Sequence, residues 1–374
     1  MPDISNIPAT MHAVLLTRHG GPEALEYVSD APVPIPGEGE VLIEVTACGM
    51  NNTDIWVREG AYGTDDDPNA TASWRRGSDD DTLQFPRIQG ADTVGRIVET
   101  GPGVDRGRIG ERIMVDFSIY NGDGCSLIDI DYFGHGRDGG YAEYMVVPAA
   151  QAHHSKTAMS DAELATFCCA YLTGEHMLDR AGLKAGETVL VTGASGGVGS
   201  GIIQLARARG AIPYAICGAS KAETVKAIGA EAVIAREDGN LLKAVPDVMN
   251  GRPVDVVADL VAGDMFKDLI NLIRPEGRYT TAGAIAGPVV EVDLRTVYLK
   301  HLTLHGSSQG TRKAFERLHG YIEGGQIRPL LWQTYPLSKI NQAQADFKNK
   351  GYVGKLVMQP DAKWQPVQPW LAGS

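Results

Sequence analysis

The sequence predicts an α/β protein in which an all-β unit is joined to a unit with a doubly wound parallel sheet. Two patterns lead to this fold class. From Met11 to about Pro148, short apolar runs are separated by glycine and proline, which is typical of antiparallel strands. From Asp161 the apolar residues recur at helical intervals, and strands then alternate with helices, which favours a parallel sheet. At 374 residues, the chain is long enough for two domains.

The strands expected in the first unit lie in five apolar segments. They are MHAVLLTRHG, EVLIEVTACG, TVGRIVETG, GERIMVDF and GYAEYMVVP. A polar, Asp-rich segment at residues 63–84 interrupts them, and we interpret it as a surface insertion or a lid. Its two DDD runs lack the alternating ligand spacing and closing Glu of a calcium loop, so a solvated loop is the preferred interpretation.

The second unit alternates strands and helices. The expected strands are ETVLVTGA, AIPYAICG, EAVIA, VDVVADLV and GRYTTAGAI. The expected helices are GGVGSGIIQLARARG, SKAETVKAIG and DMFKDLINLIRP. Two more helical stretches and a last strand, KLVMQP, follow, and we expect this tail to return to the first unit. The predicted domains are therefore residues 1–160 with 310–374, and residues 161–309.

Composition and charge exclude several classes of function. The net charge of -12 is spread along the chain and no basic block is present, so nucleic acid is not an expected partner. No apolar run approaches bilayer-spanning length, and the N-terminus does not resemble a signal peptide. Five cysteines without a CxxC argue against a disulfide framework. We expect a soluble, cytoplasmic protein with no membrane partner.

The segment TVLVTGASGGVGSGIIQLARARGA has the order strand, glycine-rich turn, helix, which is typical of a dinucleotide-binding turn. Gly196 would let the backbone approach a pyrophosphate, and Gly199 would allow the helix to pack closely on the strand. Ala194 stands where the strict GxGxxG has its first glycine, so an ordinary tight turn is the alternative. The predicted cofactor-binding residues here are Ala194, Ser195, Gly196, Gly197, Val198 and Gly199.

The next strand ends at AICGASK, where an NAD-binding protein usually carries an Asp or Glu for the ribose hydroxyls. No carboxylate stands there. Gly218, Ser220 and Lys221 follow instead, and they suit a 2′-phosphate. NADP(H) is therefore the predicted cofactor. The alternative is that Lys221 only caps the start of a solvated helix and binds no phosphate. We also assign to the cofactor site Ala282, Gly283 and Lys355.

Five segments of the chain together resemble the medium-chain dehydrogenase/reductase superfamily almost from end to end. They are PGEGEVLIEVTACGMNNTD, FPRIQGADTVGRIVETG, GGYAEYMVVP, the glycine-rich turn and GYVGKLVMQP. The resemblance implies a GroES-like β domain formed by both chain ends and a central Rossmann domain, with the active site in the cleft between them. It also implies a homodimer formed through the edge strand of the nucleotide domain, here LTLHGSS.

The zinc-dependent alcohol dehydrogenases of this superfamily hold a catalytic zinc through Cys, His and Cys, often with a nearby Glu. Matched to this chain, the three ligand positions carry Asn51, Ala91 and Cys169, and the acidic position carries Asp92. Alanine has no donor atom, and asparagine is a poor ligand for zinc. The resemblance therefore implies an enzyme without a metal.

The zinc-free quinone oxidoreductases of the superfamily are similar in having Gly-x-Asn-x-x-Asp, which GMNNTD matches at Gly49, Asn51 and Asp54. The resemblance gives Thr53 the place of a proton-relay hydroxyl and Trp56 that of a pocket-wall aromatic. It puts Thr173 against the nicotinamide. A turn hydroxyl and a plain core residue are equally good interpretations of Thr53 and Trp56.

Reduction of a quinone or an α,β-unsaturated carbonyl suits a site without a metal. Hydride attack on these small molecules gives a delocalised phenolate or enolate that a few hydrogen bonds stabilise. The predicted function is an NADPH-dependent oxidoreductase in which Asn51 or Thr53 donates a hydrogen bond to the substrate oxygen. Thr173 would orient the nicotinamide, and water or Thr53 would supply the proton.

Two other functions stay open. One is an alcohol dehydrogenase with a degenerate metal site, built from Cys169, Asp92 and either Cys48 or His135. The other is an NADPH-binding protein with a structural or sensing role, since a fold alone does not define a function.

Overall fold

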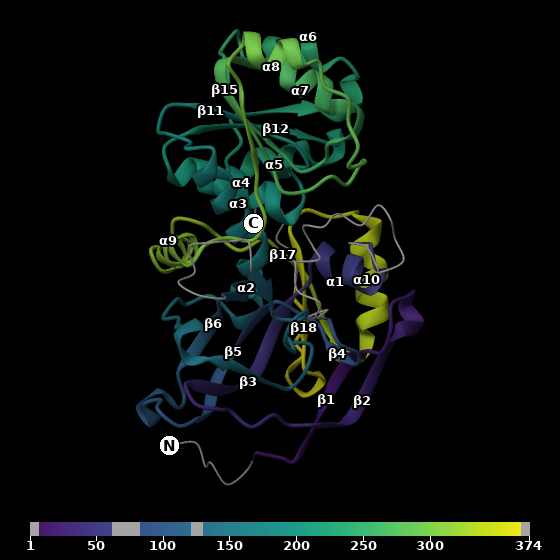
Figure 1. Ribbon diagram of the computed structural model, residues 1–374, viewed down its shortest axis with the longest axis vertical. Coiled ribbons are helices and arrows are strands. Elements are labelled where there is room, and N and C mark those ends of the chain that lie inside the picture. The colour runs from purple at the N-terminus through teal and green to yellow at the C-terminus, as the bar shows by residue number, and fades with distance from the viewer. Residues whose placement is uncertain (1–6, 62–82, 121–129, 368–374) are drawn as a thin grey trace. The chain divides into compact units, whose positions relative to one another are not determined.

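The computed structural model describes residues 7–61, 83–120 and 130–367, so the Asp-rich segment 63–84 lies almost wholly outside the described residues. The chain divides into two compact units (Figure 1). Of the described residues, the first unit comprises 7–61, 83–120, 130–169, 329–351 and 355–367, and the second comprises 170–328 and 352–354. The boundaries expected from the sequence come earlier along the chain. The short helix α2 (Asp161–Leu164) belongs to the first unit, where it packs on strands, and helix α9 (Arg312–Glu323) belongs to the second.

The first unit is built from three β-sheets. Its strands are β1 (Thr10–Leu16), β2 (Leu25–Pro32), β3 (Glu40–Gly49), β4 (Arg87–Ile88), β5 (Asp92–Thr100), β6 (Arg112–Val115), β7 (Ser118–Tyr120), β8 (Ile130–Tyr132), β9 (Tyr144–Pro148), β10 (Ala152–His154), β17 (Leu331–Pro336) and β18 (Lys355–Gln359). The largest sheet has the order β10-β6-β5-β3-β18-β17, with β9 also paired to β3. All its pairs are antiparallel except β17 with β18. The smaller sheets are β2-β1-β4 and β7-β8.

The alternation of apolar residues along β3 explains the core of this unit. Val41, Ile43 and Val45 point to one face and pack with Ile97 and Phe133 in a buried cluster. Each of the five segments predicted as strands in this unit contains a strand of the structure, namely β1, β3, β5, β6 and β9. The unit also has α1 (Asn52–Arg58), a helix that the sequence pattern did not predict. Two helices were expected: α2, at the start of the helical stretch from Asp161, and α10 (Ile340–Asn349).

The second unit contains a six-stranded sheet in which every pair is parallel. Its strands are β11 (Thr188–Val191), β12 (Ile212–Cys217), β13 (Ala232–Ala235), β14 (Val254–Asp259), β15 (Ile273–Thr281) and β16 (Thr303–Gly306). The order β13-β12-β11-β14-β15-β16 is that of a Rossmann fold, with the topological switch between β11 and β14. Ligands bind such sheets at the carboxyl ends of the strands beside the switch. The predicted doubly wound parallel sheet is confirmed.

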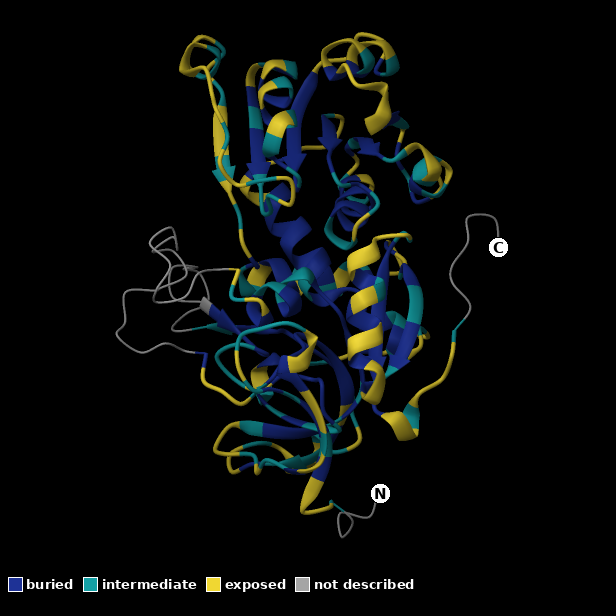
Figure 2. Ribbon diagram, turned by 90° about the vertical axis from the view of Figure 1, so that its right-hand side faces the viewer, coloured by how far each residue is buried: buried dark blue, intermediate teal, exposed yellow. Residues whose placement is uncertain are grey.

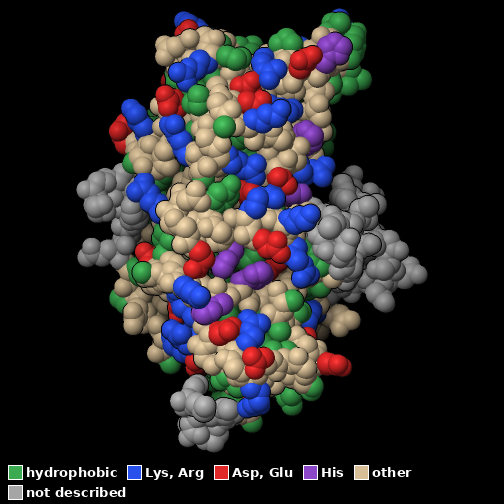
Figure 3. All heavy atoms as spheres, turned by 90° about the vertical axis from the view of Figure 1, so that its left-hand side faces the viewer, with side chains coloured by type: hydrophobic (Ala, Val, Ile, Leu, Met, Phe, Trp, Pro, Cys, Tyr) green, Lys and Arg blue, Asp and Glu red, His purple; other side chains and the backbone are tan. Residues whose placement is uncertain are grey.

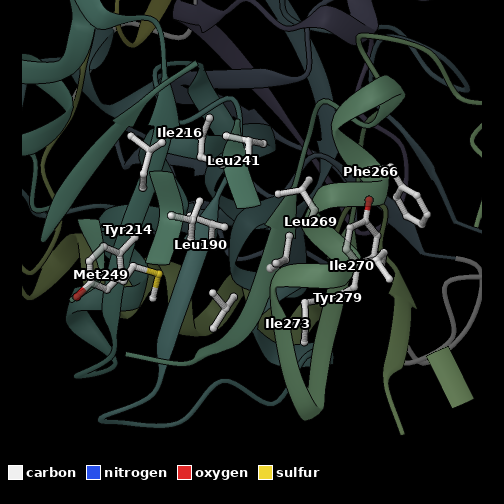
Figure 4. Packing of buried hydrophobic residues seen from close by; sticks show 14 residues of the cluster. Leu190, Tyr214, Ile216, Leu241, Met249, Phe266, Leu269, Ile270, Ile273 and Tyr279 are labelled. Carbon is white, nitrogen blue, oxygen red and sulfur yellow. The ribbon is translucent and has the colours of Figure 1, made fainter. Parts of the chain in front are cut away.

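Helices α4 (Gly197–Ala208), α5 (Ala222–Ala227), α6 (Leu241–Val248) and α7 (Phe266–Leu272) pack on strands of this sheet. The other α-helices between α2 and β17 are α3 (Cys168–Arg180), α8 (Leu294–Leu299) and α9. Leu190 and Ile216 of the sheet pack with Leu241 of α6 and Leu269 of α7 (Figure 4). Strands of both units are largely buried, and exposed residues follow loops and outer helix faces (Figure 2).

The surface and the helices agree with the composition. Acidic and basic side chains are interspersed over the face shown in Figure 3. Within the described ranges, no helix is long and apolar enough to cross a membrane.

Candidate active site and cofactor site

The segment from β3 to α1 is shaped by its glycine, asparagine and aspartate. A Cβ atom on Gly49 would lie 2.2 Å from the carbonyl oxygen of Ala165, so only glycine fits there. Asn51 is the N-cap residue of α1, with an extended backbone. Its amide nitrogen donates to Oδ2 of Asp54, three residues further on, at 2.8 Å. The spacing Gly-x-Asn-x-x-Asp is therefore the local requirement for this strand-to-helix turn.

A buried ammonium group lies beside Asn51. Nζ of Lys355, at the start of β18, donates to Oδ1 of Asn51 at 2.5 Å and to Oδ2 of Asp92 at 3.0 Å. The other carboxylate oxygen of Asp92 accepts from the backbone amide of Cys169 at 2.7 Å. The Lys355 side chain is only 3% exposed and that of Asp92 is 0% exposed, so this is a buried ion pair in which each carboxylate oxygen accepts a hydrogen bond.

A second carboxylate, Asp54, is buried close to this ion pair. The hydroxyl of Tyr141 donates to Oδ2 of Asp54 at 2.8 Å. Burial raises the pKa of Asp54 to about 6, and the charge of Asp92 adds to the rise, while hydrogen bonds and Lys355 oppose it. Burial, together with the charges of Asp92 and Asp54, also raises the pKa of the Cys48 thiol well above its usual value. Cys48 is therefore a protonated, apolar packing group at neutral pH.

The hydroxyl of Thr53, on the first turn of α1, shares a hydrogen bond of 3.0 Å with the hydroxyl of Tyr132. The ring of Tyr132 stacks on His135 with centroids 5.3 Å apart, and Nδ1 of His135 lies 2.9 Å from Oδ1 of Asp131. Thr53 is thus connected, through Tyr132 and His135, to Asp131, and the sequence pattern did not predict these contacts. Trp56 lies half-buried one turn further along α1.

The glycine-rich turn of the second unit has the geometry that its pattern predicted, with one difference. A Cβ on Gly199 would lie 2.4 Å from the carbonyl oxygen of Gly193, so glycine is required for α4 to start against the turn. Gly196 is the N-cap residue of α4. The left-handed conformation of the turn falls on Gly193, with φ 57°, which is why the buried Ala194 is tolerated after it. The first-turn amides of α4 have no partners within the helix and suit a phosphate.

The carboxyl end of β12 holds two charged residues that the sequence analysis missed. Gly218 precedes a short turn that contains Ser220 and Lys221. Glu237, just after β13, accepts from the amide of Ala219 at 3.0 Å and pairs with Arg236 at 3.2 Å. Its Oε1 lies 3.5 Å from where a Cβ of residue 218 would be. The signal was present, because RED follows the strand EAVIA and carboxyl ends of neighbouring parallel strands meet at one edge.

The carboxyl ends of β11, β14 and β15 are joined through one buried carboxylate. Oδ1 of Asp259 accepts from the hydroxyl of Thr192 at 2.5 Å, and Oδ2 accepts from that of Tyr279 at 2.6 Å. Ala282 and Gly283 directly follow β15, and the carbonyl of Gly283 accepts from Thr281 at 3.1 Å. These contacts hold the strand ends beside the switch point in place.

Thr173 is a buried residue of α3 and belongs to the second unit. The other predicted cofactor residues also belong to the second unit, except Lys355. Asn51, Thr53, Trp56 and Lys355 are all in the first unit.

Comparison with known proteins identifies the family of both units. Residues 37–157 match the family described as alcohol dehydrogenase GroES-like domain, and residues 197–323 match zinc-binding dehydrogenase. Quinone oxidoreductase of Lama guanicoe is 30% identical over 361 residues, covering 93% of this chain and 97% of its own. NAD-dependent alcohol dehydrogenase of Sulfurisphaera tokodaii is 27% identical over 363 residues, covering 94% and 100%. A solved Sinorhizobium meliloti structure, provisionally named an alcohol dehydrogenase, is 66% identical, with a TM-score of 0.92 and coverage of 96% and 99%.

The chain belongs to the medium-chain dehydrogenase/reductase superfamily, with its GroES-like and Rossmann-type domains. It is an oxidoreductase, similar to quinone oxidoreductases and alcohol dehydrogenases alike.

The residues that the resemblance matches to the family's zinc position do not fit the metal. Oδ1 of Asn51 already accepts from the ammonium of Lys355, and both carboxylate oxygens of Asp92 are occupied by hydrogen-bond donors. Ala91 has no donor atom. Among residues 7–61, 83–120 and 130–367, no three His, Cys, Asp or Glu side chains gather in a way that could hold a metal ion. We therefore derive no catalytic step through zinc.

Proposed function

We propose that this enzyme is an NADPH-dependent reductase that transfers a hydride to a quinone or an α,β-unsaturated carbonyl without a metal. One observation supports the proposal: Asn51 and Asp92, which the resemblance matches to positions at the family's metal site, are both hydrogen-bonded to the ammonium of Lys355. Such a site offers hydrogen bonds but no Lewis acid. A phenolate or enolate spreads its charge and needs less stabilisation than the localised alkoxide formed from a simple ketone.

NADPH, when bound, supplies the hydride from its nicotinamide. The side-chain amide of Asn51 and the hydroxyl of Thr53 would donate hydrogen bonds to the substrate oxygen as it becomes negative. Thr53 would then give a proton to the product anion and recover one from Tyr132, whose hydroxyl is 3.0 Å away, and ultimately from water. Trp56 would form a wall of the substrate pocket, and Thr173 would orient the nicotinamide ring.

The choice of NADPH rests on the residues after β12. Ser220 offers a hydroxyl, and Lys221 and Arg236 offer two cations to a 2′-phosphate. The turn from Ala194 to Gly199 would bind the pyrophosphate, and Ala282 and Gly283 would line the nicotinamide side. The carboxylate of Glu237 also lies beside Gly218 and Ala219, at the end of β12. NADH is therefore the second candidate cofactor, because a carboxylate at this strand end suits the ribose hydroxyls.

We also propose a homodimer formed through β16. This strand pairs only with β15 among the described strands, so its other edge offers backbone hydrogen bonds. Large apolar side chains near it are exposed, with Leu304 at 43%, Leu294 at 66% and Val289 at 92%. Such an edge suits a second copy of the chain.

A cytoplasmic location completes the proposal. Three buried cysteines among the described residues, Cys48, Cys168 and Cys217, form no disulfide. Unpaired thiols suit a reducing compartment, and cell fractionation tests this.

The function is tested with purified, metal-analysed protein, by following oxidation of NADPH and NADH with a quinone, an enone and a simple aldehyde. We expect turnover with NADPH and the quinone or enone that survives a chelator. Asn51→Ala combined with Thr53→Ala should lower kcat/KM by about 10²-fold or more. Asn52→Ala is the matched control, because this neighbouring side chain accepts from Lys350 and has no proposed role. Zinc-dependent aldehyde reduction, or full activity of the double variant, would contradict the proposal.

A further inference from the structure

Asp259, the last residue of β14, is a buried carboxylate that collects hydrogen bonds from three segments of the chain. It accepts from the hydroxyl of Thr192 at 2.5 Å and from that of Tyr279 at 2.6 Å. The backbone amides of Val261 and Ala262 also donate to it, at 2.9 and 3.2 Å. Asp259 is 0% exposed, and none of these donors is a cation. Burying a carboxylate among neutral donors is costly, so we expect a role that a neutral side chain would not fill.

The same two strands carry a second threonine–aspartate pair at their amino ends. The hydroxyl of Thr188, in β11, donates to Oδ2 of Asp255, in β14, at 3.2 Å. Asp255 also has a cation beside it, because Nε of Arg274 donates to its Oδ1 at 2.5 Å. This pair already links β11 to β14 at one edge of the sheet. Linking the two strands therefore explains the pair at the amino ends, but it leaves the buried charge of Asp259 unexplained.

Asp259 differs in its place, because the carboxyl edge is where a parallel sheet binds its ligand. The glycine-rich turn packs on the loop after β14, since a Cβ on Gly193 would lie 3.4 Å from Cγ2 of Val261. The loop after β15 packs on it as well, since a Cβ on Gly283 would lie 3.3 Å from the carbonyl oxygen of Leu260. Asp259 therefore fixes the backbone on which both predicted cofactor-binding segments rest.

A carboxylate suits this place because it only accepts hydrogen bonds and has room for about four. Ala262 has φ 54°, in the left-handed region that a residue other than glycine rarely adopts. Its amide lies 3.2 Å from both oxygens of the carboxylate, which stabilise this conformation. The hydroxyl of Thr192 accepts in turn from the amide of Leu260 at 2.9 Å. Burial and the charge of Asp259 raise the pKa of Tyr279 above its ordinary value, so its hydroxyl stays a donor.

We propose that Asp259 is a positioning residue that preorganises the part of the cofactor site for the pyrophosphate and the nicotinamide. The inference rests on the proposed function, which puts NADPH at this edge of the sheet. Asp259 does not touch the cofactor; it holds the turn and the two loops in the shape that binds it, so little ordering is left to occur on binding. The 2′-phosphate site is separate, because β12, which precedes Ser220 and Lys221, lies on the other side of β11.

The test compares threonine substitutions at the two edges of the sheet. Thr192→Val removes the hydroxyl that contacts Asp259, and Thr188→Val, the matched control, removes the hydroxyl that contacts Asp255. Each deletes one link between β11 and β14 and keeps the shape of the side chain, so we expect similar losses of thermal stability. Thr192→Val should raise the Kd for NADPH, read from nicotinamide fluorescence, by about 10-fold, and Thr188→Val should leave it unchanged. Equal Kd values in the two variants, raised or native, would overturn the proposal.

A second variant and a fragment of the cofactor separate positioning from general damage. Tyr279→Phe removes only a hydroxyl, and the ring keeps its edge-to-face contact with Phe266, with centroids 5.3 Å apart (Figure 4). We expect the Kd for NADPH to rise about 10-fold here too, with a native Kd for adenosine 2′-phosphate in both Thr192→Val and Tyr279→Phe. A loss of affinity for this fragment as large as that for NADPH would refute the positioning role.

The binding result can be told apart from the proposed reaction, because the titrations contain no substrate. If the native enzyme reduced neither quinones nor enones, the proposed function would fail while the Kd values would still decide the role of Asp259. If NADH were the cofactor, the same variants would be compared with NADH. A native protein that bound neither cofactor would contradict this inference as well.

Discussion

Replacing Asp54 with asparagine should remove a specific dependence of stability on pH. The pKa of Asp54 is raised from 3.8 to about 6 by burial, and the charge of Asp92 adds to it, while Lys355 and the hydrogen bonds from Asn51 and Tyr141 oppose it. The folded state therefore holds the proton more tightly than the unfolded chain. The group stabilises the fold below pH 3.8, and this stabilisation is lost as pH rises through about 6. The pKa difference corresponds to about 3 kcal/mol of unfolding free energy.

The assay is urea unfolding of the native enzyme and of Asp54→Asn at several pH values from 4 to 7. The free energy of unfolding of the variant, minus that of the native enzyme, should rise by about 2.5 kcal/mol over this range, because at pH 4 the unfolded chain is already partly ionised. Any constant cost of the substitution cancels from the comparison. Asp264→Asn, at an exposed position of the second unit, is the control and should show no such rise. A difference for Asp54→Asn that stays flat with pH would refute the reasoning.

Three further predictions follow from the cofactor site and the sheet edge. Gly199→Ala should lower the free energy of unfolding by about 1–3 kcal/mol, because its Cβ would meet a backbone carbonyl oxygen at 2.4 Å. Gly196→Ala should mainly raise the Kd for NADPH. Thermal unfolding and NADPH titration of both variants check this, and a larger loss of stability in Gly196→Ala than in Gly199→Ala would contradict it. Glu237→Gln should raise the kcat/KM ratio of NADPH over NADH by about 10-fold, and an unchanged ratio would exclude Glu237 as a determinant. Leu304→Lys should convert a dimer to a monomer in light scattering, and a monomeric native enzyme would contradict the proposed interface.

The parts of the fold that depend on neighbours in sequence were predictable. Strand alternation, helical periodicity and the glycine-rich turn are local patterns, and all appear in the structure as expected. Helix α1 was not expected, because it is short and follows directly on a strand, so its apolar pattern covers less than two turns. Its capping pair, Asn51 and Asp54, was nevertheless visible in the sequence and was interpreted only as a family motif.

The sequence by itself determined the class of fold and the place of the glycine-rich turn between a strand and a helix, because these depend on residue type at short spacing. Only the tertiary structure decided which side chains surround Asn51 and Asp92. Lys355 reaches Asn51 and Asp92 because β18 pairs with β3, and β3 with β5, in one sheet. Glu237 reaches the end of β12 because β13 lies beside it. Such contacts are set by strand order, and no pattern within a single segment carries that information.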